Sequence, residues 1–270
     1  MSVYAIPADK RYILEPLTAH LSDTMILSCM QGHIGEAYAD DPEMPTSCRL
    51  DVVDFTFLCG APNAELATFK PADVQLERGI KTRDFMIMVP ENDPWAEVIE
   101  QVHRDRYKMV IRYAFHHTAE GFDREKLQNA VDSLSDEYEL KLIDWEIYEK
   151  SLTAQWNGWQ WASDWCGQFK HYEDYGKHGL GAAILHDGEL VAGASSYSYY
   201  DEGIEIQIDT REDHRRKGLA CACASALMLE CLKRGLYPSW DAQNLLSVEL
   251  AKKLGYRYAG EYAAYEVTWK

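Results

Sequence analysis

The sequence predicts a mixed α/β fold of the α+β type, and three features of its second half carry that prediction. Segment 186–188 reads His-Asp-Gly between two apolar runs, and Asp-Gly favours the type I′ turn of a β-hairpin. Ile204, Ile206 and Ile208 then alternate with polar residues, as in a strand with one buried face. Segment 215–234 follows and reads as a helix, which is buried on several sides because residues 219–229 are apolar nearly all round. A sheet that contains an antiparallel hairpin and packs against helices is therefore expected.

The length and composition of the chain are compatible with two domains. The chain has 270 residues, of which 47% are hydrophobic and 12% aromatic, so a packed core is expected. This length fits one large domain or two of about 130 residues. Turn and helix signals divide the chain near its middle. We predict an N-terminal α/β domain over residues 1–137 and a second domain over 138–270.

The first half shows strand and helix patterns in alternation. A Pro-containing turn at 41–46 separates two strand-like segments, and Pro90 stops a third. Apolar residues at helical spacing follow Pro94, and a β-branched and aromatic run comes next. The expected elements are strands at 35–40, 49–59 and 84–89, a helix at 95–102, a strand at 108–115 and a helix at 123–134.

The second half is more regular. Gly235 and Gly255 each end a helical pattern, as glycine commonly does just past a helix. The expected elements are an extended segment at 138–148, one or two helices within 153–175, hairpin strands at 181–185 and 190–197, a strand through 204–208, a helix at 215–234, a strand at 237–242, a helix at 245–254 and a final strand at 258–268.

The excess of acidic over basic residues restricts the kinds of molecule that the protein is expected to bind. Asp and Glu number 44 against 27 Lys and Arg, which gives a net charge of -17. A nucleic-acid surface needs clustered basic residues, so no nucleic-acid partner is expected. No apolar run approaches the roughly 18 residues of a membrane span, and the start does not resemble a signal peptide. A cytoplasmic protein with no membrane contact is expected, its partners neutral or cationic.

The seven cysteines form an odd, scattered set, which predicts reduced core thiols rather than disulfides. Cys221 and Cys223 are the only close pair, and positions i and i+2 of a helix point to nearly opposite sides. Adjacent strand residues also point oppositely, so His116 and His117 do not face one metal easily. No metal is expected.

The segment from Thr210 to Ala220 joins a strand to a helix and has the character of a phosphate site. A helix start leaves backbone N–H groups unpaired, and these attract anions. Gly218 would let a diphosphate approach the backbone closely, and Arg215, Arg216 and Lys217 add positive charge. A solvated basic helix start is the alternative interpretation.

Three motifs in this region resemble the GCN5-related N-acetyltransferase (GNAT) superfamily. Residues 215–220 (Arg-Arg-Lys-Gly-Leu-Ala) match its acetyl-CoA motif, Q/R-x-x-G-x-G/A. Asn244 and Ser247 match its N-x-x-A/S helix start, and residues 254–256 match its helix-ending L-G-F/Y. The resemblance covers about residues 138–270 and implies a mixed, mostly antiparallel sheet whose fourth and fifth strands splay apart around acetyl-CoA.

The resemblance implies a set of acetyl-CoA-binding residues. Pantetheine would pair with the strand 205–209, and the pyrophosphate would lie on the amides of 216–220. The implied binding residues are Ile206, Ile208, Thr210, Arg215, Arg216, Lys217, Gly218, Leu219, Ala220, Asn244 and Ser247. The whole chain also looks like a bacterial two-part subgroup whose first half lacks the motif. We therefore hypothesise that the first half is a degenerate copy of the same fold.

Acetyl transfer to an amine needs a base, because a primary amine with a pKa of about 10 is mostly protonated at neutral pH. Glu205 is the candidate base, with an ordinary solvent-facing strand Glu as the alternative and Glu202 as a weaker substitute. A backbone N–H of the strand 206–208 would hold the oxyanion. Where the family commonly carries an acid tyrosine, this chain has Ala251; Tyr256 is either core or a replacement acid.

The Trp-rich segment lies where the resemblance places the acceptor site. Trp161, Trp165 and Phe169 recur every four residues and are expected in the core. Trp156 and Trp159 fall off that stripe and are candidate substrate-binding residues, with a cation–π face for a protonated amine.

Two functions fit these observations. The first is an N-acetyltransferase that transfers acetyl from acetyl-CoA to a small, cationic amine by direct attack in a ternary complex. The second is a CoA-binding regulator or interaction protein, which Ala251 favours. The segment 197–200 fits either the edge of a homodimer or a solvent-facing rim.

Overall fold

The computed structural model describes residues 3–76 and 79–269, which form two compact units. The first unit comprises Met1–Arg112 and Glu261–Lys270, and the second comprises Tyr113–Gly260. The chain thus leaves the first unit once and returns to it with its last strand.

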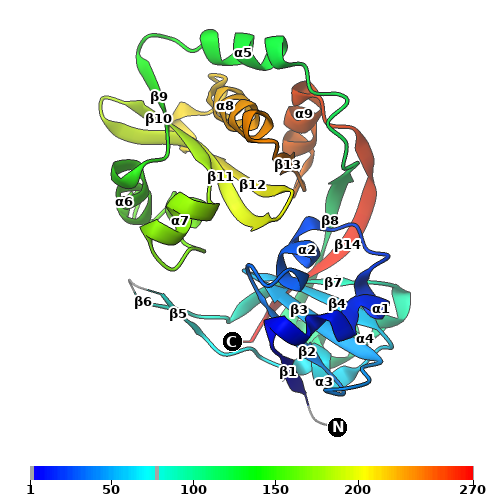
Figure 1. The fold of residues 1–270 in the computed structure, drawn as a ribbon. Coiled ribbons are helices and arrows are strands. Elements are labelled where there is room, and N and C mark those ends of the chain that lie inside the picture. Colours follow the sequence, from blue (N-terminus) through cyan, green and yellow to red (C-terminus); the bar gives the residue numbers. More distant parts are fainter. Residues whose placement is uncertain (1–2, 77–78, 270) are drawn as a thin grey trace. The chain divides into compact units, whose positions relative to one another are not determined.

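The first unit is built on a seven-stranded sheet (Figure 1). Its pairs are antiparallel from β1 to β4 and between β7 and β14, whereas β4 and β7 run parallel. Strands β8 and β14 each have one end in the other unit. In spatial order the strands are β1 (Tyr4–Ile6), β2 (Glu36–Ala39), β3 (Ser47–Val52), β4 (Phe55–Gly60), β7 (Phe85–Pro90), β14 (Tyr258–Thr268) and β8 (Tyr107–Phe115).

Helices and a small hairpin complete the first unit. Trp95 and Ile99 of α4 are fully buried against Leu58 of β4 and Met88 of β7. The remaining elements are η1 (Ala8–Leu14), α1 (Glu15–Thr18), α2 (Thr24–Met30), α3 (Ala64–Thr68), α4 (Asp93–His103), η2 (Arg104–Arg106) and the antiparallel strands β5 (Val74–Leu76) and β6 (Gly79–Lys81).

The second unit is built on a five-stranded sheet in which only β12 and β13 pair in parallel. The β10–β11 turn has Asp187 and Gly188 at φ of 50° and 79°, as the Asp-Gly pattern predicts. In spatial order the strands are β13 (Tyr237–Ser239), β12 (Gly203–Thr210), β11 (Glu189–Tyr200), β10 (Gly181–His186) and β9 (Tyr138–Leu142).

Helices pack on both faces of this second sheet (Figure 1). Ala182 and Ile184 lie in one core with α8, whereas Ala183 and Leu185 lie in another with α6 and α7, as alternation along a strand requires. The helices are α5 (Arg124–Asp132), α6 (Trp145–Thr153), η3 (Ser163–Trp165), α7 (Tyr172–His178), η4 (Glu212–His214), α8 (Leu219–Arg234) and α9 (Leu245–Leu254).

The predicted mixed α/β fold with mostly antiparallel sheets is confirmed, and several elements need correction. Segment 49–59 is not one strand but parts of β3 and β4, joined by a tight turn in which Val53 takes a φ of 58°. Segment 138–148 is extended only to Leu142, because the Asp144 side chain accepts a hydrogen bond from the Ile147 amide and starts α6.

The prediction of one or two helices within 153–175 is wrong for most of that segment. Asn157 and Gly158 take positive φ values of 50° and 83°, so the backbone turns and Trp156 and Trp159 exchange two hydrogen bonds. The expected core role of Trp165 and Phe169 is nevertheless confirmed, because both are buried. Their burial comes from η3 and the following turns rather than from a helix.

The boundary predicted at residue 137 falls inside the second unit, between α5 and β9. Helix α5 packs on α8, and the last strand pairs with β7 of the first unit. The compact units therefore divide the chain at 112 and 260. Whether 1–137 and 138–270 are separate folding domains stays a prediction.

The cysteines and the helices bear on two further expectations. All seven cysteines are buried and free, as predicted. Within residues 3–76 and 79–269, no helix is long and apolar enough to cross a membrane.

Candidate functional site

Strands β12 and β13 separate shortly after they pair. Their parallel pairing runs from Gly203 with Tyr237 to Glu205 with Ser239. Beyond this point β12 continues to Thr210 paired with β11, whereas Ala242 forms a bridge with Tyr113. One edge of β12 from residue 206 to 210 therefore has no strand partner in the described part of the chain. This is the type of open edge to which an extended amide chain such as pantetheine can pair.

Helix α8 begins without a side-chain cap. Its N-cap residue is Gly218 at a φ of +82°, and no side chain accepts a hydrogen bond from its first amides. Every other described α-helix longer than four residues has such a cap, from Asp23, Asn63, Asn92, Asp123, Asp144, His171 and Asn244. The first N–H groups of α8 are therefore available to an anion.

The surroundings of Gly218 fit a bound phosphate. A Cβ atom built on Gly218 would meet no described heavy atom within 4 Å, so there is open space in front of the helix start. The positive φ also explains why α8 begins at Leu219 and not near residue 215, as the sequence predicts. Arg216 likewise has a φ of 63° and cannot be helical. The described residues thus fit the diphosphate of acetyl-CoA.

The basic residues before α8 are partly positioned by neighbours. Arg215 Nε donates to the Thr210 carbonyl at 3.2 Å, and Lys217 Nζ lies 3.1 Å from the Tyr138 hydroxyl. Arg215 and Arg216 are exposed. The Thr210 hydroxyl is buried without a hydrogen-bond partner among described atoms. The positive charges of Arg215, Arg216 and Lys217 precede the uncapped amides, and their contact with a phosphate stays a prediction.

The apolar members of the predicted site have core roles. Ile206 and Leu219 are buried between β12 and α8, and Ile208 packs against the same core. Their side chains fix the strand and helix, so any contact with acetyl-CoA falls to their backbone. Ala220 is half-buried in the first turn of α8.

Asn244 and Ser247 stabilise the start of α9. Asn244 Oδ1 accepts a hydrogen bond from the Ser247 amide at 3.0 Å, which is an N-cap interaction. Ser247 Oγ accepts from Trp240 Nε1 at 3.1 Å. Local capping thus accounts for this pair, and its contact with acetyl-CoA stays a prediction.

Glu205 is buried and is not the solvent-facing strand residue of the alternative interpretation, with an exposed fraction of 6%. Its charge acts on two tyrosine hydroxyls, those of Tyr237 and Tyr200. Burial raises the pKa of Tyr237 to about 12, and the charge of Glu205 adds to that shift. Burial also raises the pKa of Tyr200, again with a contribution from Glu205. Glu202, the weaker substitute, is exposed.

Tyr256 has the environment of a core residue. Its hydroxyl donates to the Pro238 carbonyl at 2.6 Å, and burial raises its pKa well above the ordinary value. A hydroxyl held in this way is a poor proton donor, so the structure gives the acid role no support. Ala251 is completely buried in α9, at the position where the resemblance leads one to expect a tyrosine.

The two candidate acceptor tryptophans differ in their surroundings. The Arg211 guanidinium lies 4.5 Å from the centre of a Trp156 ring, and Arg211 is itself paired with Glu189 and Asp213. One face of Trp156 is therefore already occupied by a cation of the chain. Trp159 is 75% exposed.

Sequence reasoning missed a second acidic residue of β12. Asp209 lies on the same face as Glu205 and Gln207, and Gln207 Nε2 donates to its Oδ2 at 3.3 Å. Burial raises its pKa to about 6, and the negative charge of Asp164 contributes. The alternation of isoleucine with polar residues over 204–208 places Asp209 on the same face as Glu205, and this signal could have identified it.

The segment 197–200 is not a solvent-facing rim. Tyr200 is buried, and Tyr199 stacks on Phe169 and His178 at centroid distances of 5.9 and 4.7 Å. These aromatic side chains are used within the second unit. A dimer edge at this segment stays a prediction.

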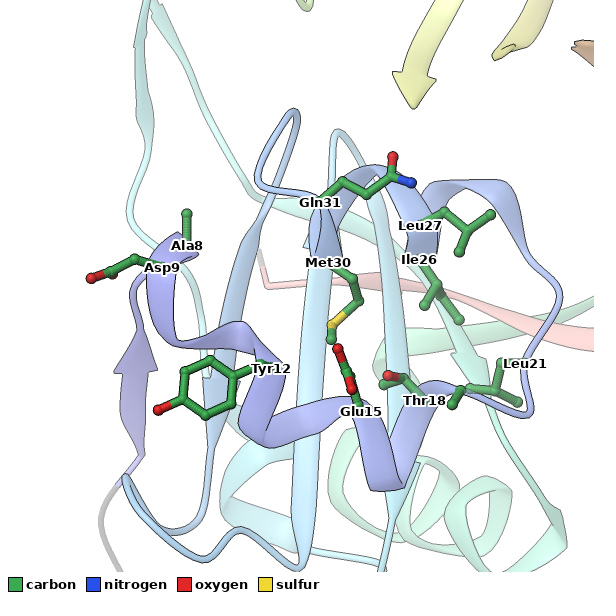
Figure 2. Close-up of a pocket in the computed structure, with 11 residues that line it drawn as sticks. Ala8, Asp9, Tyr12, Glu15, Thr18, Leu21, Ile26, Leu27, Met30 and Gln31 are labelled. Atoms are coloured by element: carbon green, nitrogen blue, oxygen red, sulfur yellow. The ribbon is translucent and has the colours of Figure 1, made fainter. Parts of the chain in front are cut away.

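A cavity of about 440 Å³ lies in the first unit (Figure 2). Figure 2 shows Glu15 in the middle of the view, with Tyr12 to one side and Leu27 to the other. The lining of this cavity contains none of the residues predicted to bind acetyl-CoA or an acceptor, because those residues belong to the second unit. Its lining includes Asp9, Tyr12, Glu15, Ile26, Leu27 and Met30.

The splayed strands and the uncapped, glycine-led helix are the features that the sequence resemblance to the GNAT superfamily implies. A GNAT acetyltransferase family model matches residues 15–265, and the chain belongs to this family. The match includes most of both units, although the motifs lie only in the second.

Relatives agree with this assignment. The chain is 40% identical to a GCN5-related N-acetyltransferase-like protein from Streptococcus suis 89/1591, with a TM-score of 0.86 over 96% of this chain and 99% of that one. It is 26% identical to the uncharacterized N-acetyltransferase YdfB of Bacillus subtilis (strain 168), over 86% of this chain and 85% of that protein.

A two-part fold is also found among solved structures. A tandem GNAT protein from the clavulanic acid biosynthesis pathway has a TM-score of 0.59, covering 100% of this chain and 98% of that one at 11% identity. This likeness concerns the fold alone. It agrees with two sheet-based units, and the ancestry of the first unit stays a hypothesis.

Proposed function

We propose that this protein transfers an acetyl group from acetyl-CoA to the primary amine of a small, cationic molecule. Membership of the GNAT family implies acetyl transfer. The observation that carries the proposal is the uncapped start of α8 at Gly218, beside the open edge of β12. Together they offer a phosphate site and a strand edge for one molecule of acetyl-CoA.

The chain's own residues have separate tasks in the proposed reaction. Acetyl-CoA supplies the thioester, and the amides after Gly218 together with Arg215 and Arg216 hold its phosphates. Glu205, buried at the point where β12 and β13 separate, takes a proton from the attacking amine. A backbone N–H on the open edge of β12 stabilises the oxyanion, and no side chain is needed for that task.

The acceptor class follows from charge. The face of β12 that holds Glu205 also holds Asp209, and Asp164 lies close enough to Asp209 to influence it. A net charge of -17 disfavours an anionic acceptor and favours a cationic amine. Trp159, which is exposed, remains the candidate aromatic contact for it.

The cellular setting is proposed from chemistry. Seven free cysteines suit a reducing compartment, and we therefore place the protein in the cytoplasm. We propose no nucleic-acid or membrane partner, and we leave the homodimer as a prediction to be tested by sedimentation.

A CoA-binding regulator is the second candidate, favoured by Ala251 and by the buried Tyr256 hydroxyl. CoA release should be measured for a panel of polyamines, aminoglycosides and amino acids, with wild type and Glu205→Gln side by side. Transfer that falls at least about 100-fold in Glu205→Gln supports the enzyme. Tight acetyl-CoA binding without transfer to any amine would contradict it and favour the regulator.

A further inference from the structure

A chain of hydrogen bonds joins three polar side chains near Glu205. The Tyr200 hydroxyl lies 2.8 Å from His117 Nε2 and 3.0 Å from Ser239 Oγ. Tyr200 and Ser239 are buried, whereas His117 is exposed. The chain therefore leads from the interior of the second unit to its surface.

Ser239 is the inner end of this chain and the immediate neighbour of Glu205. The two residues are register partners in the parallel β12–β13 pair, so their side chains lie on the same face of the sheet. Glu205 and Ser239 are 6% and 4% exposed. The charge of Glu205 also acts on Tyr200, so carboxylate and hydroxyls share one buried polar region.

The segment that carries His117 is held in place. The Tyr237 hydroxyl donates to the His116 carbonyl at 3.2 Å and accepts from the Thr118 amide at 3.2 Å. The rings of His117 and Tyr237 are 3.9 Å apart between centroids. The imidazole is therefore fixed against Tyr237 and Tyr200.

Burial favours the neutral form of His117. Tyr200 comes from β11 and Tyr237 from β13, and Glu202 is the nearby charge. Burial lowers the pKa of His117, and Glu202 only partly opposes this. Nε2 can therefore accept a hydrogen bond from Tyr200, with the ring proton on Nδ1.

The proposed reaction requires an exit for one proton. A cationic amine nitrogen carries three protons and the amide product carries one, so two protons leave as the nitrogen–carbon bond forms and the carbon–sulfur bond breaks. One proton ends on the CoA sulfur. The other must reach water, and Glu205 is too buried to release it directly.

We propose that Ser239, Tyr200 and His117 relay this second proton from Glu205 to solvent, with His117 as the exit. The inference rests on the proposed acetyltransferase function. Each hydroxyl accepts a proton from its inner neighbour as it donates its own outward. His117 receives the proton on Nε2 and passes one to water.

His117→Gln tests the relay, because a glutamine oxygen accepts the Tyr200 hydrogen bond but takes no proton at neutral pH. We expect kcat to fall at least about 10-fold below about pH 8 and to recover with added imidazole. The dissociation constant of acetyl-CoA and the Tm should not change. His116→Gln, at the exposed neighbouring histidine, is the matched control and should behave as wild type.

A titration of His117 by NMR gives a second result that does not depend on turnover. The Tyr200 hydroxyl bond favours the neutral imidazole, so Tyr200→Phe should raise the pKa of His117. An unchanged titration, or normal kcat in His117→Gln with an active wild type, would overturn the relay alone. A wild type that acetylates no amine would overturn the relay and the proposed function together.

Discussion

The two units each place a helix after a strand that pairs in parallel with a later one, but the two helix starts differ. In the first unit β4 runs beside β7 and leads to α3, where Asn63 Oδ1 accepts hydrogen bonds from the amides of Glu65 and Leu66. In the second, β12 runs beside β13 and leads to α8, where Gly218 supplies no side-chain cap.

This difference is the basis on which we place the proposed acetyl-CoA site in the second unit. A parallel strand pair followed by a helix is common to both units, so that arrangement alone does not make a phosphate site. Asn63 already satisfies amides of α3, which spans only five residues, and Glu65 adds negative charge. At α8 the amides are uncapped, and three basic residues precede Gly218. We infer one acetyl-CoA site per chain, in the second unit.

The largest expected effect is on binding. Gly218→Glu should weaken acetyl-CoA binding at least about 100-fold, because a carboxylate would replace phosphate at the amides of α8. Calorimetry should show one site in wild type and none in the variant. Gly188→Glu is the control for strain, since Gly188 has a φ of +79° and similarly open surroundings in a hairpin turn. Acetyl-CoA affinity in Gly218→Glu equal to that of wild type would place the site elsewhere and break the comparison.

A buried carboxylate of the first unit should matter for stability. Asp51 and Arg49 are completely buried, and their closest atoms are 2.8 Å apart. Asp51→Asn should lower the free energy of unfolding by about 3 kcal/mol, because it leaves the Arg49 charge without its counter-charge. Urea denaturation measures this. A loss below about 1 kcal/mol would show that the pair is not structural.

Removing the charge of Asp209 in the second unit should stabilise the protein, which is the opposite of the effect expected for Asp51. The pKa of Asp209 is raised from 3.8 to about 6, so the folded state binds a proton more tightly than the unfolded state and loses stability as pH rises through this window. Asp209→Asn should therefore raise the free energy of unfolding at neutral pH by roughly 1 to 2 kcal/mol. Below about pH 4 the gain should vanish. A variant less stable than wild type at neutral pH would refute this assignment.

The smallest effect concerns the cap of α3. Asn63→Ala should lower the free energy of unfolding by about 1 kcal/mol, since two amides lose their acceptor. Asn63→Asp, which retains a capping oxygen, is the control. The affinity for acetyl-CoA should stay the same, and a change in it would mean that the first unit takes part in donor binding.

Local sequence signals predicted much of the fold. Helix α9 and strand β14 have the predicted bounds, and Asn244 and Gly255 mark the ends of the helix. Where the sequence carries no local signal, the secondary-structure prediction failed. The turn at Val53 lacks the glycine or asparagine that usually marks positive φ, and the elements before residue 35 follow no clear period.

The candidate site was predictable only where it is continuous in sequence. Residues 210–220 form one segment, and their motif could be recognised directly. His117, Tyr200 and Ser239 lie 83 and 39 positions apart, and only the tertiary fold brings them together. The adjacent histidines His116 and His117 are visible in the sequence, but the only role considered for them there was metal binding, which strand geometry disfavours.

A crystal structure with CoA tests the central claim most directly. The account predicts one CoA per chain, with its pyrophosphate oxygens about 3 Å from the amides that follow Gly218 and its pantetheine along the open edge of β12. A pyrophosphate bound away from the start of α8, or a second CoA at the start of α3, would contradict it.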